Sequence, residues 1–440
     1  MTLSDAFVAA SLSVACGSLL VGCDEDSDRP GGGGPDGGDD GGDGGADGGP
    51  DGSRPHPLYP PLDLATLPGS GGAASGPYTP PALPTTSREV TVGTTGAQAG
   101  TDLMAACDTP GTAVDVPDAA GRIGVINIGN VEDCDITLGP AVVIDFLVVG
   151  SLPGPAHAPS HRVRIRGGQI GSVLVIGGSS DLVFDGVAIN NGVVPSAGRS
   201  AGGIYMPPGE GPDEVVERFA VVRSFIRLVA MPVGPDLDGA AYLGVRARDV
   251  FFADNNVVTA GNRNSWGFRI GGGDNALIVD NTVRVSFHKF VRMNDNPVDY
   301  VYIKGGIWMR EETLTSGGAL LADSWAQLTG STTDQVYVHD PVAYLMPDLS
   351  ASFGAAIDAA QDGRLWEARR IEWHARSANA MDDAHLQILV DACAGVGAIC
   401  DYGIGTHTYE YDPALSFPAD PWRDLPTFDD DDPDNLPVEP

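Results

Sequence analysis

Short runs of alternating apolar and polar residues recur through the middle of the chain. Six of them align without gaps: VRIRGGQI, LVFDGVAI, FAVVRSFI, VFFADNNV, ALIVDNTV and YVYIKGGI, which begin at Val163, Leu182, Phe219, Val250, Ala276 and Tyr300. Alternation with a period of two is the pattern of a β-strand, and the Gly, Asn or Asp in the middle of each run indicates a sharp corner. Each run therefore predicts a strand, a corner and the start of a second strand.

Two positions of these runs are apolar in all six copies. The third positions are Ile165, Phe184, Val221, Phe252, Ile278 and Tyr302, and the eighth positions are Ile170, Ile189, Ile226, Val257, Val283 and Ile307. Successive runs begin 19, 37, 31, 26 and 24 residues apart, which is the period of a solenoid with insertions in two repeats. Residues at one position should then stack at the strand spacing of about 4.8 Å.

A further strand precedes the corner-containing run in several repeats, namely SVLVIG from Ser172, YLGVRA from Tyr242, WGFRIG from Trp266 and KFVRMN from Lys289. This succession of strand, corner and strand resembles the right-handed parallel β-helix of the pectate-lyase-like superfamily. The resemblance implies an all-β solenoid over residues 87–411, with weaker repeats at VYVHDPV, RIEWHAR and LQILVDAC. A β-sandwich would also give short strands, but not the same residue type in the same column. A short helical pattern within Arg88–Val116 predicts an N-terminal cap over the first edge.

The N-terminus carries an export signal. The apolar stretch Ala6–Gly22 ends in Leu20-Val21-Gly22-Cys23, which resembles the lipobox of a bacterial lipoprotein signal peptide, although Met1–Asp5 lacks the expected basic residue. Residues 1–22 are therefore the predicted signal peptide, and Cys23 is the predicted lipidation site. The alternatives are a plain secretory signal or a chance apolar terminus.

Two acidic tails account for much of the formal net charge of −34. Asp24–Asp51 carries ten acids and one Arg, and Asp420–Glu439 carries eight acids and one Arg, so together they contribute −16. Residues 23–86 are predicted to be a disordered Gly/Asp/Pro-rich linker and residues 412–440 an acidic disordered tail. Ser160–Arg310 is slightly basic, with 16 Lys and Arg against 14 Asp and Glu. The global charge therefore describes solvated tails rather than a binding face.

The cysteines agree with export. Cys107, Cys134, Cys393 and Cys400 remain in the mature chain, an even number that suits disulfides in an oxidising compartment. Four cysteines allow three pairings, of which Cys107 with Cys134 and Cys393 with Cys400 close the shortest loops. Metal binding is the alternative, but neither pair has the short spacing of a zinc site. We expect a lipid-anchored protein of the bacterial cell envelope, at the outer membrane or cell surface.

Three arginines between apolar residues raise a question of function. Arg246, Arg269 and Arg292 are 23 residues apart, so the repeat predicts one outward column of guanidinium groups. One interpretation is structural, with the column neutralised by Asp249, Asp254, Asp274 and Asp295. The other is a groove for an acidic polysaccharide, because repeated bidentate donors suit carboxylates or sulfates.

The groove hypothesis assigns roles to nearby residues. Arg246, Trp266 and Tyr242 would bind substrate, with the aromatic rings as sugar-stacking platforms. In a polysaccharide lyase Arg269 and Arg292 would neutralise the carboxyl group, and Lys289 or His288 would be the base. The competing function is a non-catalytic, adhesin-like structural lipoprotein, in which a lone His or Lys is merely solvated.

Other motifs narrow the interpretation. The calcium-binding Asp cluster of pectate lyases and the close aspartates of polygalacturonases are not found in the sequence, so the family does not decide whether the chain is an enzyme. Asn255 and Asn281 sit at equivalent corners and predict a buried asparagine ladder. No metal site and no cofactor are expected, with calcium capture by the acidic tail as the alternative. The chain is expected to be a monomer, with no nucleic-acid partner.

Overall fold

The computed structural model describes residues 79–150, 158–193, 202–207, 215–229, 239–244, 246–260, 265–270, 273–285, 290–293, 298–310, 326–327, 335–345, 365–376, 383–384, 386–387, 390–391 and 400–418. All of them belong to one compact unit, Pro55–Pro440. The predicted signal peptide, Cys23 and most of the predicted linker lie outside the described residues.

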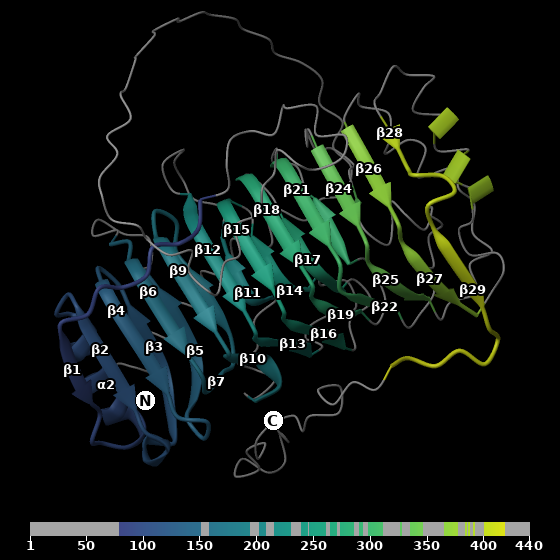
Figure 1. Ribbon diagram of the computed structural model, residues 1–440. Coiled ribbons are helices and arrows are strands. Elements are labelled where there is room, and N and C mark those ends of the chain that lie inside the picture. The colour runs from purple at the N-terminus through teal and green to yellow at the C-terminus, as the bar shows by residue number, and fades with distance from the viewer. Residues whose placement is uncertain are drawn as a thin grey trace, which may run out of the picture. The chain divides into compact units, whose positions relative to one another are not determined.

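Nearly all of the described structure is parallel β-sheet (Figure 1). Sheet A contains β1 (Arg88–Thr91), β2 (Thr112–Val116), β4 (Glu132–Leu138), β6 (His161–Arg166), β9 (Ser180–Asp185), β12 (Val216–Val222), β15 (Ala247–Ala253), β18 (Gly273–Val279), β21 (Val298–Lys304), β24 (Gln335–His339), β26 (Leu365–Arg369) and β28 (Cys400–Asp401). Each strand pairs in parallel with strands from the preceding and following repeats, so the sheet grows along the chain.

Sheet B starts with β3 (Arg122–Ile128) and β5 (Val143–Val149) and continues as two columns of short strands. The first column contains β7 (Gln169–Ile170), β10 (Ala188–Asn190), β13 (Phe225–Val229), β16 (Asn256–Ala260), β19 (Thr282–Val285), β22 (Ile307–Arg310), β25 (Val342–Leu345), β27 (Glu372–Ala375) and β29 (Thr408–Tyr411). The second contains β8 (Val173–Val175), β11 (Gly202–Met206), β14 (Gly239–Gly244), β17 (Ser265–Ile270), β20 (Val291–Met293) and β23 (Ala326–Gln327). A repeat is one strand of sheet A with the sheet B strands that follow it, an arrangement compatible with a β-helix.

The predicted stacking is confirmed over five of the six aligned runs. Ile189 pairs with Ile170 and with Ile226, and Val257 pairs with Ile226 and with Val283. The third positions from Ile165 to Ile278 pair in the same way in sheet A. Both columns are buried in one continuous apolar core between the sheets. Burial of that continuous apolar surface stabilises the stack of repeats.

The alignment of the sixth run was wrong by one residue. Ile303, not Tyr302, pairs with Ile278, and Trp308, not Ile307, pairs with Val283. Ile303 and Trp308 are fully buried in the main core, whereas Tyr302 packs on the outer face of sheet A. The aromatic ring made Tyr302 look like a core residue, although the inward positions of this strand belong to Val301 and Ile303.

The N-terminal cap is present as predicted. Helix α2 (Gly96–Cys107) packs its buried side, which includes Ala99, Leu103 and Ala106, against the first strands. Gly100 allows this approach, because a Cβ there would lie 2.7 Å from the Cδ1 of Ile126. A disulfide joins Cys107, the last residue of the helix, to Cys134 in β4. The other predicted pairing is not tested, because Cys393 lies outside the described residues.

From β6 to β26, the corner after each sheet A strand has a special backbone conformation. Residues in equivalent places of successive repeats adopt the left-handed region, with φ between 50° and 68°: Gly167, Gly186, Arg223, Asp254, Asp280, Gly305, Asp340 and Arg370. Glycine adopts this conformation without strain, and Asp and Asn tolerate it better than most residues. The Gly and Asp that marked corners in the sequence therefore stand where the chain turns left-handed, and Asn255 and Asn281 directly follow such an Asp.

Two of the three weak C-terminal repeats are confirmed. VYVHDPV forms most of β24 and the first residue of β25, and RIEWHAR contains β27. LQILVDAC is not a further strand, since Leu386–Gln387 and Val390–Asp391 are helical, with Leu386 buried in the core. The apolar pattern there reflects burial, which a short helix shares with a strand.

Candidate functional site

Arg269 and Arg292 occupy equivalent places in neighbouring repeats. They pair directly across β17 and β20. Phe268 and Ile270, on either side of Arg269, are buried in the core, so Arg269 lies on the outer face of sheet B. The predicted stacking of these two arginines is thus confirmed, while the side chain of Arg292 lies outside the described part of the chain.

Arg246 does not belong to this column. The residue that pairs with Arg269 from the preceding repeat is Leu243 in β14. Arg246 lies between β14 and β15, where its carbonyl accepts a hydrogen bond from the N–H of Val216. The spacing of 23 residues is correct from Arg269 to Arg292, but the preceding repeat is 26 residues long at this column, as the pairing of Leu243 with Arg269 shows. The prediction that three arginines stack was therefore wrong for Arg246.

The guanidinium of Arg269 lies over an aromatic ring. Its Cζ is 5.5 Å from the ring centroid of Trp266, which lies three residues earlier in β17. This is the geometry of a cation–π contact. Within the described residues, no carboxylate forms an ion pair with Arg269, and the side chain is partly exposed. The predicted neutralisation by Asp249 or Asp254 is not observed for Arg269, since Asp249 lies within β15 of sheet A and Asp254 directly follows that strand. The side chains of Asp274 and Asp295 lie outside the described residues.

Arginines on the outer face of sheet A contrast with Arg269. Asp133, Arg162, Asp181, Arg218 and Asp249 alternate in charge through successive repeats, and all have left-handed φ values. Arg162 Nε lies 2.8 Å from Asp133 Oδ1, and Arg218 Nε lies 2.7 Å from Asp181 Oδ1. The hydrogen bond from Arg162 holds the pKa of Asp133 below its ordinary value. On this face of sheet A, Arg162 and Arg218 are thus each paired with an aspartate of the preceding repeat.

The two predicted aromatic platforms differ from the expectation. Tyr242 is fully buried in the core, where its ring lies 4.6 Å from that of Phe252, and burial raises the pKa of its hydroxyl. It cannot stack on a sugar at the surface, so its assignment to substrate binding was wrong. Trp266 is 1% exposed and packs with Ala240 and Tyr205 outside the main core. The Trp266 ring is therefore covered and contacts the guanidinium of Arg269. It does not present an exposed face on which a sugar could stack.

Several predicted site residues lie outside the described residues. His288 and Lys289, the candidate bases, are among them, as are the acidic tail beyond residue 418 and Cys393. Over the ranges that are described, no group of three or more His, Cys, Asp and Glu side chains is arranged to hold a metal ion.

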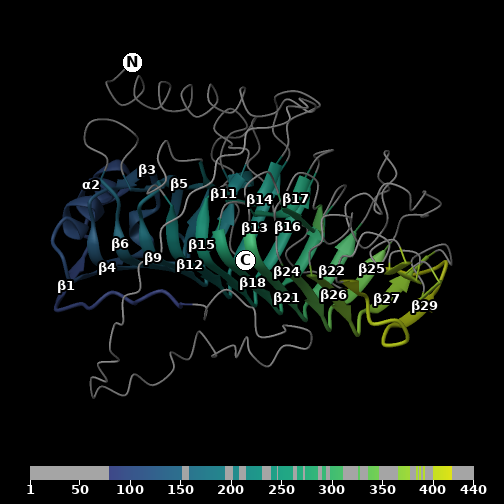
Figure 2. The same ribbon diagram turned by 90° about the horizontal axis from the view of Figure 1, so that it is seen from above.

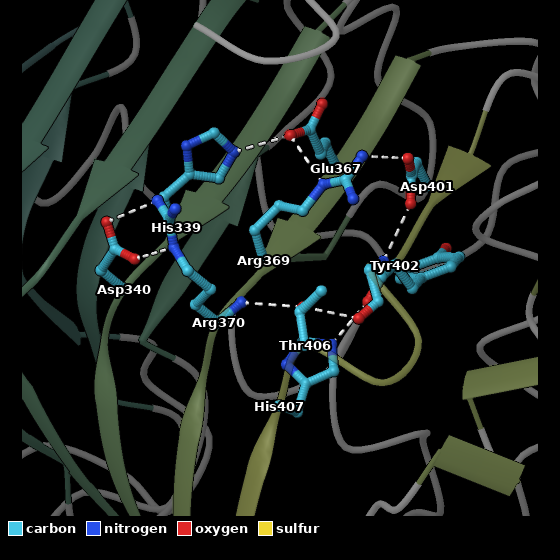
Figure 3. Close-up of polar contacts among 10 residues, drawn as sticks. His339, Asp340, Glu367, Arg369, Arg370, Asp401, Tyr402, Thr406 and His407 are labelled. Atoms are coloured by element: carbon cyan, nitrogen blue, oxygen red, sulfur yellow. Dashed lines mark hydrogen bonds and ion pairs between the residues drawn. The ribbon is translucent and has the colours of Figure 1, made fainter.

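A second polar cluster lies on the outer face of sheet A near its C-terminal end (Figure 3). Nε2 of His339 in β24 lies 3.1 Å from Oε1 of Glu367 in β26, and Nε of Arg369 donates to the same oxygen at 3.1 Å. The guanidinium of Arg369 also bonds to Asp401 in β28. Side-chain exposure rises from 2% at His339 and 1% at Glu367 to 28% at Arg369 and 49% at Asp401. The chain of contacts therefore runs from a buried histidine to the surface.

Glu367 has an unusual environment for an ionisable group. It is fully buried, and no hydrogen-bond partner for its Oε2 occurs in the described part of the chain. Tyr337 lies beside it in the paired strand, and burial together with the charge of Glu367 raises the pKa of Tyr337 to about 12. The ring of Tyr302 meets that of His339 edge-on at 5.4 Å. Oε1 of Glu367 contacts both His339 and Arg369, so it can orient the imidazole and neutralise the guanidinium. A carboxylate that bonds to one ring nitrogen in this way fixes the tautomer of the histidine.

A further histidine, His407, connects the last repeats through hydrogen bonds of both ring nitrogens. Nδ1 of His407 accepts the N–H of Ile371 at 3.1 Å, and its Nε2 bonds to the carbonyl of Tyr402. One ring nitrogen thus accepts while the other must carry the proton, which is the arrangement of a neutral imidazole. Burial lowers the pKa of His407. Figure 3 shows His407 and Tyr402 on the C-terminal side of Arg369.

The sequence contains a signal for this cluster. VYVHDPV and LWEARR place His339, Glu367 and Arg369 at outward positions of strands whose inward residues are apolar. VYVHDPV was interpreted only as a degenerate repeat, and LWEARR was not singled out. Only the pairing of Tyr337 with Glu367 and of His339 with Arg369 shows that these side chains lie together in one cluster.

A recess of about 430 Å³ lies at the corner between sheet A and the first column of sheet B. Glycines 167, 168 and 186 line it, together with Arg223 and Asp254 from the next two repeats. Arg223 is already neutralised by Asp185, with Nη2 to Oδ1 at 2.6 Å. The recess therefore offers hydrogen-bonding groups but no uncompensated guanidinium.

Comparison of the chain with protein-family models, with curated proteins and with solved structures returned no match. Helices with the length and apolar character to cross a membrane do not occur among the described residues.

Proposed function

We propose that the chain is a lipid-anchored protein of the bacterial cell envelope whose right-handed parallel β-helix binds or cleaves an acidic polysaccharide. The fold part of the proposal extends the observed parallel stacking of repeats to the pectate-lyase-like superfamily. The anchor part depends on the Leu20–Cys23 lipobox and the Gly/Asp/Pro-rich stretch that follows it. A lipid and a tether would hold the folded unit away from a membrane.

The observation that carries the binding part is the environment of Arg269. Its guanidinium contacts the Trp266 ring and forms no ion pair with a carboxylate of the described residues, while arginines on sheet A are matched to aspartates. An uncompensated guanidinium on an outer face is available to an anionic ligand. The aromatic ring below it fixes its position and adds cation–π stabilisation.

The register suits a polymer better than a single small anion. Arg292 occupies the next repeat at the same position, and repeats are separated by the strand spacing of about 4.8 Å. A chain of uronic acid or sulfated sugar units could meet both groups along the axis of stacking. If the protein is a lyase, Arg269 and Arg292 neutralise the substrate carboxyl group, and Lys289 or His288 removes the proton.

Retention on immobilised polyanionic glycans tests the binding part. Arg269→Ala should weaken binding about tenfold, the value of a lost charge-assisted hydrogen bond of about 1.4 kcal/mol. Arg248→Ala is the matched control, because it removes the same charge from a side chain that is 46% exposed and already paired with Glu217. Both variants should retain the thermal midpoint of the parent chain.

Equal retention of parent, Arg269→Ala and Arg248→Ala would reject the glycan site and favour the structural, adhesin-like lipoprotein. Cleavage is tested by following the ultraviolet absorbance of unsaturated products with alginate, pectate and glycosaminoglycans. Binding without any product across that panel would leave the binding function and reject the lyase.

A further inference from the structure

Sheet A carries an apolar strip on its outer face. The strip consists of six side chains in direct register from β9 to β24: Val183, Ala220, Phe251, Leu277, Tyr302 and Tyr337. Their neighbours along each strand, such as Phe184 and Val221, point into the main core, and the strip forms a cluster separate from that core. These six residues therefore face away from the interior of the fold.

The strip is nevertheless shielded from water. Each of its six residues is at most 3% exposed, and Phe251, Leu277 and Tyr337 are at most 1% exposed. Burial raises the pKa of Tyr302 and that of Tyr337 to about 12. Outward-facing side chains reach such values only when another part of the protein covers them.

The described residues before β1 indicate which part of the chain reaches the strip. Leu83 packs against it. The N–H of Ala82 bonds to Asp181 Oδ1 at 2.9 Å, and the N–H of Thr85 bonds to Asp133 Oδ1 at 3.1 Å. The segment therefore crosses the repeats of sheet A on its outer side and heads toward the cap, as Figure 2 shows. Followed backwards from Ala82, the chain approaches from the side of the strip.

We propose that the apolar run Leu58–Leu67, LYPPLDLATL, docks on this strip and covers it. The run combines four leucines, a tyrosine and two prolines, and its prolines favour an extended backbone without unsatisfied donors. It is separated from the acidic tether by only a few residues.

The lengths permit this contact. The strip spans five strand spacings, about 24 Å in total. Gly69–Gly76, GSGGAASG, contains eight residues, and a Gly- and Ser-rich linker of that length has a mean span of about 16 Å. Six residues, the number from Pro77 to Ala82, add about 18 Å when extended. Leu58–Leu67 can therefore lie anywhere along the strip while Leu83 keeps its contact.

Deletion of residues 58–67 from the full chain tests the proposal, with deletion of residues 37–46, GGDDGGDGGA, as a control of equal length. The first deletion should lower the thermal midpoint and increase the fluorescence of a hydrophobic dye. It should also move the titration of the two tyrosines from about 12 toward the ordinary value of about 10. The control deletion should change none of these quantities.

A synthetic peptide of residues 58–67, added to the deletion variant, should suppress the dye signal, and a peptide with Asp in place of Leu62 and Leu64 should not. If the deletion variant does not fold, Leu62→Ser with Leu64→Ser in the full chain provides a milder test of the same three quantities. A photo-crosslinker at residue 62 should label β15, β18 or β21. Unchanged dye binding and tyrosine titration, or crosslinks confined to other elements, would overturn the proposal.

Discussion

Asn281 accepts both hydrogen bonds that Asn255 directs toward it from the preceding repeat. The backbone N–H of Asn255 lies 3.0 Å from Asn281 Oδ1, and its side-chain Nδ2 lies 2.9 Å from the same oxygen. Asn255 Oδ1 in turn accepts the N–H of Ser224 at 2.9 Å. The predicted asparagine ladder is thus confirmed, and it continues one repeat further through a serine. Buried backbone donors at this corner would otherwise have no partner.

Asn281→Leu should therefore destabilise the fold by about 3 kcal/mol. The substitution keeps the branched shape of the side chain but leaves two donors of Asn255 and the carbonyl of Phe252 without the bonds that Asn281 makes to them, and each buried unsatisfied group costs about 1–3 kcal/mol. Urea unfolding measures the change. Asn127→Leu, at an exposed position, should stay within about 0.5 kcal/mol of the parent chain.

Gly186→Ala should cost about 1–2 kcal/mol through backbone strain alone. A Cβ at Gly186 meets no atom within 4 Å, but the residue has a φ of 65°, which an L-residue adopts only at that cost. Gly93→Ala is the control, since it is equally open and has no positive φ.

Gly186→Asn separates strain from packing, because later repeats carry Asp254 and Asp280 in this conformation. It should cost less than Gly186→Ala. Equal losses for Gly93→Ala and Gly186→Ala would contradict a conformational origin.

Removal of the Cys107–Cys134 disulfide should destabilise the cap by about 3.5 kcal/mol in the chain-entropy treatment of a closed loop. The two residues are 27 positions apart. The double variant Cys107→Ser with Cys134→Ser, and the reduced parent chain, should show similar losses in urea. A loss upon reduction that persists in the double variant would point to another disulfide.

Acid should weaken the C-terminal repeats through His407. Burial lowers its pKa in the folded chain, so the unfolded chain takes up the proton first as the pH falls. The contribution is complete above the ordinary histidine pKa of about 6.5 and is lost as the pH falls below that value.

Unfolding midpoints at pH 7.5 and 5.5 should therefore differ more for the parent chain than for His407→Gln. The same pH dependence in both proteins would exclude His407 as its source.

Much of the fold could be predicted because the same pattern of apolar positions and corner residues recurs along the sequence. The columns headed by Ile170 and Ile165 were visible as apolar positions, and the corners as Gly, Asp and Asn. The prediction failed where the residue type does not decide between a core position and a position on the outer face. Tyr302 is aromatic enough for a core position and amphipathic enough for an outer face, so only the strand pairing could place it.

The candidate site was harder to predict, since sequence spacing equals structural register only when repeats have equal length. The 26-residue separation of Leu243 from Arg269 displaced Arg246 from the column. Tyr242 looked available because its ring lies near the arginines in sequence, yet it faces inward. The His339–Glu367 pair escaped notice because its members are 28 residues apart and join only through strand pairing.

Strand pairing between immediate neighbours has a consequence for how such a chain can change over evolutionary time. β15 bonds to β12 and β18 alone in sheet A, so a duplicated or lost unit of roughly two dozen residues would leave every other junction unaltered. A single inserted residue inside Asp254–Asn256 would instead shift the Asn255 side chain out of the ladder. The architecture is thus permissive toward changes of a whole unit and intolerant of small ones, so its length can be adjusted to the span of whatever it contacts.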